Sequence, residues 1–175
     1  MYHPRSTVLA GMILVAAASR LCPHWPNFTP IAAMALFGGA HFADKRLAFG
    51  VPLLAMLLSD ALIGFHAGMI AVYASFALVV ALGLGLRANR TVFSVGGTAL
   101  AGALLFFLVT NFAVWSAGAL YPRTLAGLAE CYGAAVPFFR NTLAGDAFYT
   151  AVLFGGFALA QRHWPVLAET APARP

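Results

Sequence analysis

The stretch 52–60 reads PLLAMLLSD, an unbroken apolar run that ends on the carboxylate of Asp60. The stretch 141–146 reads NTLAGD and places a second acid, Asp146, at the start of another apolar run. An aspartate in or near a bilayer is costly, so it needs a partner or a task. Because the chain has only five acids, these two predict a polar site on one side of an apolar bundle.

The composition predicts an integral membrane protein. Of the 175 residues, 62% are hydrophobic and only 9% are charged, whereas a soluble domain carries about 25% charged residues. The net charge of +5 comes from basic residues scattered at loop ends, which indicates orientation in a membrane and not binding to nucleic acid. Two cysteines, Cys22 and Cys131, form neither a disulfide framework nor a zinc pattern.

Six apolar segments follow one another along the chain, at residues 6–19, 30–43, 47–65, 68–86, 92–120 and 141–160. About 20 helical residues cross the hydrocarbon core. The third, fourth and sixth segments fit that length, and the fifth exceeds it and is expected to run past the membrane. The first two are short, so they are tilted, locally broken or shielded by neighbours.

The predicted fold is an all-α membrane protein, a compact bundle of about six transmembrane helices. Residues 1–164 form a single transmembrane domain, and residues 165–175, with three prolines, form a disordered cytoplasmic tail. The first segment also fits a cleaved signal peptide, since Arg5 precedes a short apolar stretch that ends in AAA at 16–18. We expect the segment to be retained as a helix.

The basic residues predict the orientation of this bundle. With six spans and the N-terminus inside, three basic residues lie in outside segments and seven lie inside. The outside ones are Arg20, Arg123 and Arg140, and the inside ones are Arg5, Lys45, Arg46, Arg87, Arg90, Arg162 and Arg174. Because short cytoplasmic loops carry an excess of Lys and Arg, both termini are predicted to be cytoplasmic.

Polar and aromatic residues concentrate on the outer side in this topology, including Asp60, Glu130 and Asp146. Apolar walls with a few oriented polar groups predict a small-molecule pocket. The stretch 130–140 is interrupted by glycine and proline, so we expect a short outer lid helix between helices five and six. The candidate substrate-binding residues are Asn27, Asp60, His66, Asn111, Trp115, Glu130, Cys131, Tyr132, Phe138, Arg140, Asn141, Asp146 and Tyr149.

The spacing of the candidate residues along the sequence predicts which of them share a helix face. Asn111 and Trp115 are four residues apart and share a helix face, which suits either a planar ligand or an interhelical hydrogen bond. Thr142, Asp146 and Tyr149 also share a face, and Asp146 is the strongest candidate for ligand contact.

Asp60 has three open roles. Its carboxylate contacts the ligand, caps the turn at Gly64 or pairs with Arg140.

Catalytic motifs do not stand out. The chain has no GxSxG, HExxH or P-loop sequence, so we expect no enzyme activity and assign no catalytic residue, metal ligand or cofactor. Two alternatives stay open. One is a structural or assembly scaffold of the inner membrane, and the other is an intramembrane metal-dependent or thiol enzyme that uses His66, Asp60 or Cys131.

Several stretches resemble a family of uncharacterised bacterial inner-membrane proteins described as transport proteins. They are PNFTPIAAMALFGG at 26–39, LSD at 58–60, NFAVW at 111–115, PFF at 137–139 and NT at 141–142. The resemblance covers nearly the whole chain. It implies a multi-pass protein of the bacterial inner (plasma) membrane and says almost nothing about the substrate.

The arrangement also resembles the S components of energy-coupling factor (ECF) vitamin transporters, which have six short helices, cytoplasmic termini and a pocket under outer loops. The resemblance implies a vitamin-like solute, and a transmembrane coupling subunit with ATPases as partners. S components present an AxxxA face on the first helix, whereas this chain has Ser6-x-x-x-Ala10. In lacking this face, the chain resembles solitary cobalamin S components, which work without a coupling subunit and bind cobalt through a cysteine. This resemblance implies that Cys131 or Cys22 of the present chain takes the role of that cysteine.

Overall fold

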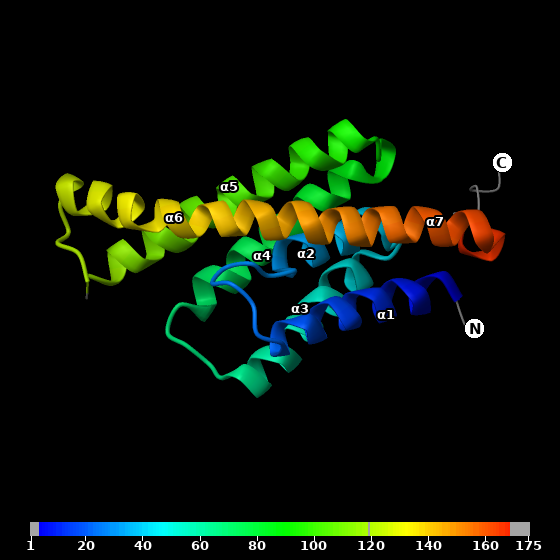
Figure 1. The fold of residues 1–175 in the computed structure, drawn as a ribbon, viewed down its shortest axis with the longest axis horizontal. Coiled ribbons are helices and arrows are strands. Elements are labelled where there is room, and N and C mark those ends of the chain that lie inside the picture. Colours follow the sequence, from blue (N-terminus) through cyan, green and yellow to red (C-terminus); the bar gives the residue numbers. More distant parts are fainter. Residues whose placement is uncertain (1–3, 119, 169–175) are drawn as a thin grey trace.

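The computed structural model describes residues 4–118 and 120–168. In these ranges the regular structure is helical throughout and strands are absent, which confirms the all-α prediction. The main helices are α1 (Pro4–Ala18), α2 (Ile31–His41), α3 (Lys45–Ile63), α4 (Met69–Gly85), α5 (Val92–Ala117), α6 (Leu125–Thr150) and α7 (Gly156–His163). A π-helical turn, η3 (Ala151–Gly155), joins α6 to α7, so the chain forms six helical rods (Figure 1).

The shortest rod, α2, lies at the centre of the bundle and packs against α1, α3, α4, α5 and α6. Its sequence, IAAMALFGGAH, is apolar on all sides, as expected for a helix that is buried all round. From Ala33 to His41 every residue is buried. Neighbouring rods therefore shield this short segment.

Glycines allow α2 and α4 to meet almost backbone to backbone. A Cβ atom added at Gly39 would fall on the carbonyl oxygen of Val80 and lie 2.9 Å from the Cα of Gly83. A Cβ atom at Gly83 would in turn lie 3.0 Å from the Cα of Gly39. Small residues permit such close approach between helices in lipid, so this crossing fixes the position of the central helix.

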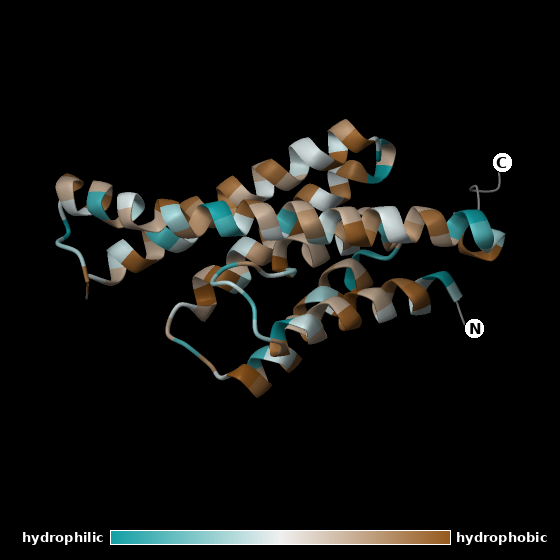
Figure 2. Ribbon diagram, in the orientation of Figure 1, coloured by the Kyte–Doolittle hydropathy of each residue, from teal (hydrophilic) through white to brown (hydrophobic). Residues whose placement is uncertain are grey.

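Within the described residues, four rods are long and apolar enough to cross a membrane: α3, α4 with its short continuation η2 (Leu86–Ala88), α5, and α6 through α7. Figure 2 shows apolar residues along much of their length. With 15 and 11 residues, α1 and α2 are shorter than the roughly 20 residues that a span needs. This agrees with the expectation that the first two segments are short.

The predicted lid helix is not a separate element. The stretch 130–140 forms part of α6, which continues without a break through η3 to His163, a rod of 39 residues. At 1.5 Å per residue this rod is about 58 Å long, well beyond a hydrocarbon core of about 30 Å. Pro137 lies inside the helix and does not end it, although a proline in a helix interior removes a backbone hydrogen bond and commonly kinks or breaks the helix.

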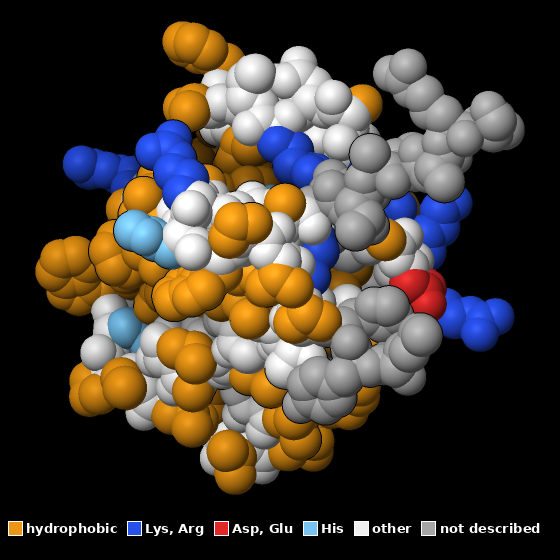
Figure 3. Space-filling view, turned by 90° about the vertical axis from the view of Figure 1, so that its right-hand side faces the viewer, with side chains coloured by type: hydrophobic (Ala, Val, Ile, Leu, Met, Phe, Trp, Pro, Cys, Tyr) orange, Lys and Arg blue, Asp and Glu red, His pale blue; other side chains and the backbone are white. Residues whose placement is uncertain are grey.

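The two ends of the bundle differ. Both termini and the connections at 42–44 and 86–91 lie at one end, here called the terminus end, and the connections at 19–30, 64–68 and 118–124 lie at the other, the loop end (Figure 1). Lys and Arg side chains are spread around the terminus end (Figure 3). Of the seven basic residues predicted inside, six fall there, and Arg174 lies outside the described residues.

Part of the predicted disordered tail is ordered. Residues Pro165–Leu167 form the 3₁₀ helix η4, and Leu167 is buried. The Arg5 guanidinium donates to the Leu167 carbonyl oxygen at 2.7 Å, and the Gln161 amide donates to the same oxygen at 3.2 Å. These contacts hold η4 against α1. Residues 169–175, the rest of the predicted tail, lie outside the described residues.

Candidate functional site

A cavity of about 380 Å³ lies near the loop end, between the central helix and α3 to α6. We call it the loop-end cavity. Four phenylalanines, together with aliphatic side chains, form its apolar walls, and amide, hydroxyl, imidazole, guanidinium and carboxylate groups project among them. Its lining residues are Arg20, Asn27, Thr29, Ile31, Ala32, Met56, His66, Val72, Phe106, Phe107, Thr110, Asn111, Ala135, Phe138, Phe139, Thr142 and Asp146.

The segment between α1 and α2 covers part of this cavity because α6 carries a glycine beneath it. A Cβ atom at Gly145 would lie 3.0 Å from the amide nitrogen of Thr29 and 3.1 Å from the Cα of Phe28. The Asn141 amide donates to the Pro26 carbonyl oxygen at 3.0 Å. The next residue, Asn27, adopts a positive φ of 62°, a conformation that Asn tolerates better than most residues. The loop is thus seated directly beside Asp146.

Arg20 and Asp60 form an ion pair at the edge of the cavity. Arg20 Nη2 lies 2.7 Å from Asp60 Oδ1, and the side chains are 11% and 3% exposed. The Tyr73 hydroxyl donates to Asp60 Oδ2 at 2.9 Å, and Arg20 also donates to the Ser59 hydroxyl. Each charge therefore has its counter-charge and further hydrogen bonds, as a buried pair requires.

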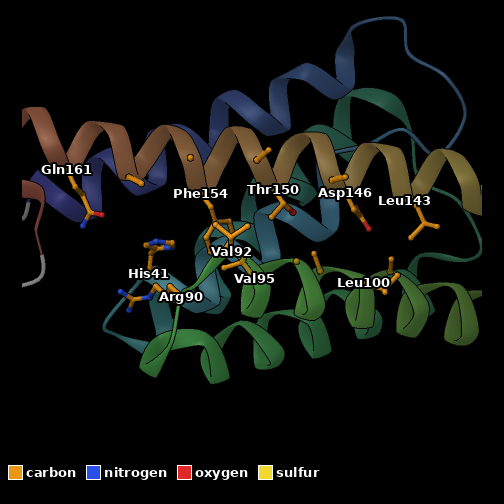
Figure 4. A pocket seen from close by; sticks show the side chains of 17 residues that line it. His41, Arg90, Val92, Val95, Leu100, Leu143, Asp146, Thr150, Phe154 and Gln161 are labelled. Carbon is orange, nitrogen blue, oxygen red and sulfur yellow. The ribbon is translucent and has the colours of Figure 1, made fainter.

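Asp146 is a buried carboxylate without such a partner. It is 5% exposed, and its Oδ2 atom has no hydrogen-bond partner in the described part of the chain. One turn further along the helix, the Thr150 hydroxyl is also buried and has no hydrogen-bond partner among the described residues. Figure 4 shows both side chains extending from α6 toward α5. Since nearly all buried polar groups are hydrogen-bonded, two adjacent exceptions indicate a place for a ligand or for water.

A second, larger hollow begins at the same aspartate. This terminus-end groove, of about 820 Å³, runs between α5 and the rod from α6 to α7 (Figure 4). Its walls are mostly Ala, Gly and Val, and His41, Arg90 and Gln161 form its far end. Because Gln161 is 15 residues beyond Asp146, the groove extends about 22 Å along the rod. Asp146 lines both hollows, and the carboxylate therefore stands between them.

The predicted site residues fall into three groups. Five lie on the loop-end cavity: Asn27, His66, Asn111, Phe138 and Asp146. Five lie outside its lining, engaged in packing or hydrogen bonds: Asp60, Cys131, Tyr132, Asn141 and Tyr149. The remaining three lie farther along the hairpin of α5 and α6 or face outward from it: Trp115, Glu130 and Arg140. A role in binding stays a prediction for all of them.

The structure gives Trp115 and Asp60 partners that the sequence analysis did not assign. Asn111 and Trp115 share a helix, yet only Asn111 lines the cavity, because the Trp115 indole donates to the Pro122 carbonyl oxygen at the turn between α5 and α6, at 3.0 Å. Asp60 pairs with Arg20 and not with Arg140, which is exposed on α6. The N–H of Gly64 is bound by the backbone carbonyl of Asp60, which leaves the carboxylate for the ion pair.

Sequence reasoning missed Arg20 and the whole terminus-end groove. Arg20 carries a usable signal, because it follows the first apolar segment directly and lies on the same predicted side as Asp60. The groove has no comparable signal. Its small apolar residues look like ordinary helix-packing positions. Only the fold shows that α5 and the rod from α6 to α7 are separated there.

Comparison with known proteins places the chain in a family. Residues 2–167 match the model of a family described as a family of unknown function (DUF6580). The chain belongs to this family. No curated protein and no solved structure gives a significant match. The family description names no function, and the indication of a helical membrane protein comes from the four candidate spans among the described residues.

Proposed function

We propose that this family member is a membrane transport protein that binds a small solute in the loop-end cavity and passes it along Asp146 to the terminus-end groove. One observation carries the proposal. The buried carboxylate of Asp146, whose Oδ2 atom has no hydrogen-bond partner in the described ranges, lines both hollows. A solute that leaves one hollow for the other must pass this carboxylate.

The charge distribution supports a direction. Described basic residues gather at the terminus end, and cytoplasmic ends of membrane proteins carry an excess of Lys and Arg. With both termini in the cytoplasm of a bacterial inner membrane, the loop-end cavity faces outward. The solute then enters from outside, as it would in an S-component-like uptake protein.

The size of the cavity supports a small solute. A volume of about 380 Å³ is near the lower end of ligand pockets, which favours a molecule much smaller than cobalamin. Cys131 supports the same choice, since its thiol donates to the Asn111 carbonyl oxygen at 3.5 Å and is outside the lining of the cavity. We therefore propose a solute of the size of a small vitamin. The proposal also includes an energy-coupling partner, such as a transmembrane subunit with ATPases.

Thiol accessibility tests the proposed path. In a background without the native thiols (Cys22→Ser with Cys131→Ser), Thr142→Cys places a probe in the loop-end cavity and Ala99→Cys places one in the groove. We expect a membrane-impermeant maleimide to label Cys at 142 only from outside and Cys at 99 only from the cytoplasmic side of intact vesicles. Leu159→Cys, on an exposed surface of α7, is the control for background labelling.

The two positions should be labelled independently. A bulky adduct at position 142 is expected to leave labelling of position 99 from the cytoplasmic side unchanged in the double variant, because that reagent enters through the groove and does not pass Asp146. Labelling of the two positions from one and the same side, or reactivity at neither position in intact membranes, would contradict a path between the two faces.

A further inference from the structure

The charges around the loop-end cavity do not balance. Three ionisable side chains line it: Arg20, His66 and Asp146. His66 lies in the connection between α3 and α4, and its side chain is exposed. The guanidinium of Arg20 and the carboxylate of Asp146 are the buried charges that a bound solute meets.

Arg20 is already neutralised. Its guanidinium lies 2.7 Å from the Asp60 carboxylate, and the Tyr73 hydroxyl satisfies the second oxygen of that carboxylate. A solute with an anionic group would have to compete with Asp60 for Arg20. It would also approach the unpaired negative charge of Asp146.

Asp146 has no comparable neighbour. Among the described residues its Oδ2 atom lacks a hydrogen-bond partner, and the nearby polar lining groups are neutral, such as the Thr142 hydroxyl and the Asn111 amide. The basic residues of the groove, His41 and Arg90, lie toward its other end (Figure 4), where the His41 ring packs against Phe154, about 12 Å along the rod from Asp146. A buried carboxylate in this setting favours a positively charged partner, because an opposite charge offsets the cost of its desolvation.

The phenylalanine walls of the cavity indicate the chemical character of the rest of the solute. Phe106, Phe107, Phe138 and Phe139 line the cavity, and the rings of Phe107 and Phe139 lie 4.6 Å apart. Aromatic faces attract organic cations, and they bury apolar carbon atoms. An inorganic cation would instead require a cluster of strong ligands, and the described residues bring together no group of three or more His, Cys, Asp or Glu side chains that could hold a metal ion.

We propose that the loop-end cavity binds an organic ammonium ion, with the ammonium group against the Asp146 carboxylate and its carbon skeleton against the phenylalanine rings. This inference rests on the proposed function, because it names the class of solute that the transport protein takes up. The Arg20–Asp60 pair sets the selectivity by leaving no free positive charge for an anion.

Reagent charge tests the inference at a single thiol. In the variant with Cys22→Ser, Cys131→Ser and Thr142→Cys, the reaction rates of a trimethylammonium-ethyl and a sulfonatoethyl methanethiosulfonate are compared. Native Cys22, which is exposed, serves as the reference thiol in a Cys131→Ser background. Relative to Cys22, we expect the ratio of cation rate to anion rate at position 142 to be at least about tenfold higher, since a nearby carboxylate attracts one reagent and repels the other.

Three variants identify the source of the charge. Asp146→Asn is expected to bring the relative ratio to within about twofold of one, while Asp146→Glu keeps the preference for the cation. Asp44→Asn is the matched control, because it removes an exposed carboxylate at the terminus end and Asn is an equally good helix N-cap. It should leave the ratio unchanged.

The uncharged methyl methanethiosulfonate separates the two proposals. If it fails to react at position 142, the cavity is closed to solutes and the proposed function falls. If it reacts while the charged pair shows no preference, or prefers the anion, only the ammonium inference is overturned.

A second measurement uses solutes of one shape. Benzylammonium should protect position 142 from the uncharged reagent at a concentration at least about fivefold lower than benzyl alcohol or benzoate, and this difference should vanish in Asp146→Asn. Equal protection by all three molecules, or protection by none, would overturn the inference.

Discussion

Asp60 and Asp146 are both buried aspartates on apolar helices, with 2% and 5% of their surface exposed, yet their surroundings differ. Asp60 lies on α3, and both of its oxygens are occupied by Arg20, from the 3₁₀ turn Ser19–Leu21 that follows α1, and by Tyr73 of α4. Asp146 lies between two hollows, and its Oδ2 atom has no partner in the described chain. Burial alone therefore does not reveal the role of an acid in a membrane protein. A counter-charge from a neighbouring segment marks an acid that stabilises the helix packing, whereas a buried acid without one is a candidate for ligand binding.

Breaking the ion pair should produce the largest loss of stability. Asp60→Asn leaves the Arg20 guanidinium buried without its counter-charge, which costs about 3–5 kcal/mol of unfolding free energy. The measurement is helix content by circular dichroism in mixed micelles as the fraction of dodecyl sulfate rises. Asp44→Asn, at an exposed cap, should change the unfolding free energy little, and a loss of less than about 1 kcal/mol at Asp60 would show that the pair is not structural.

Tyr73, whose hydroxyl donates to Asp60, should contribute less to the unfolding free energy than the ion pair does. Tyr73→Phe removes one hydrogen bond to a carboxylate, a contact worth about 1.5–3 kcal/mol. Its effect depends on Asp60, so the same substitution in the Asp60→Asn background should cost clearly less. Equal costs in both backgrounds would mean that Tyr73 stabilises the bundle by packing alone.

The sequence predicts the framework well because lipid leaves few options. Continuous apolar runs must be helical, since every backbone group has to be satisfied internally, and the short segment that became α2 had to be shielded. The prediction of a separate lid helix at 130–140 is wrong because glycine and Pro137 suggest an interruption there, whereas α6 passes through them without a break and projects at the loop end. Apolarity therefore predicts where a helix exists better than where it ends.

The site was predicted only in part, because pairing depends on which helices are neighbours. The sequence identifies Asp60 and Asp146 as unusual acids, and it places them on one side. It does not show that Arg20 reaches Asp60 while Arg140 stays exposed, since that follows from the packing of α1 against α3. It also cannot show the groove beyond Asp146, whose lining consists of residues that normally fill helix contacts.

Removing the unpartnered carboxylate should have the opposite effect on stability. Asp146→Leu replaces a buried group that lacks a hydrogen-bond partner with an apolar side chain, so the unfolding free energy is expected to rise by about 1–3 kcal/mol. The same denaturation assay, carried out without added solute, measures the change. A fall of similar size would indicate that Asp146 is held by interactions of the folded protein, and would erase the contrast with Asp60.

Tyr149 provides the smallest and most specific test, because the sequence assigns it to the face of Asp146 while the structure turns it away. Its hydroxyl lies 3.0 Å from the Ser19 hydroxyl, and its ring packs beside Phe28. Tyr149→Phe should cost about 0.5–1.5 kcal/mol, as expected for one neutral hydrogen bond, and Ser19→Ala should cost about the same. Neither variant should alter the preference of a thiol at position 142 for the cationic reagent. A lower preference for the cationic reagent in Tyr149→Phe alone would place the phenol in the binding site. Tyr149 would then count as a ligand-facing residue, as the sequence predicts.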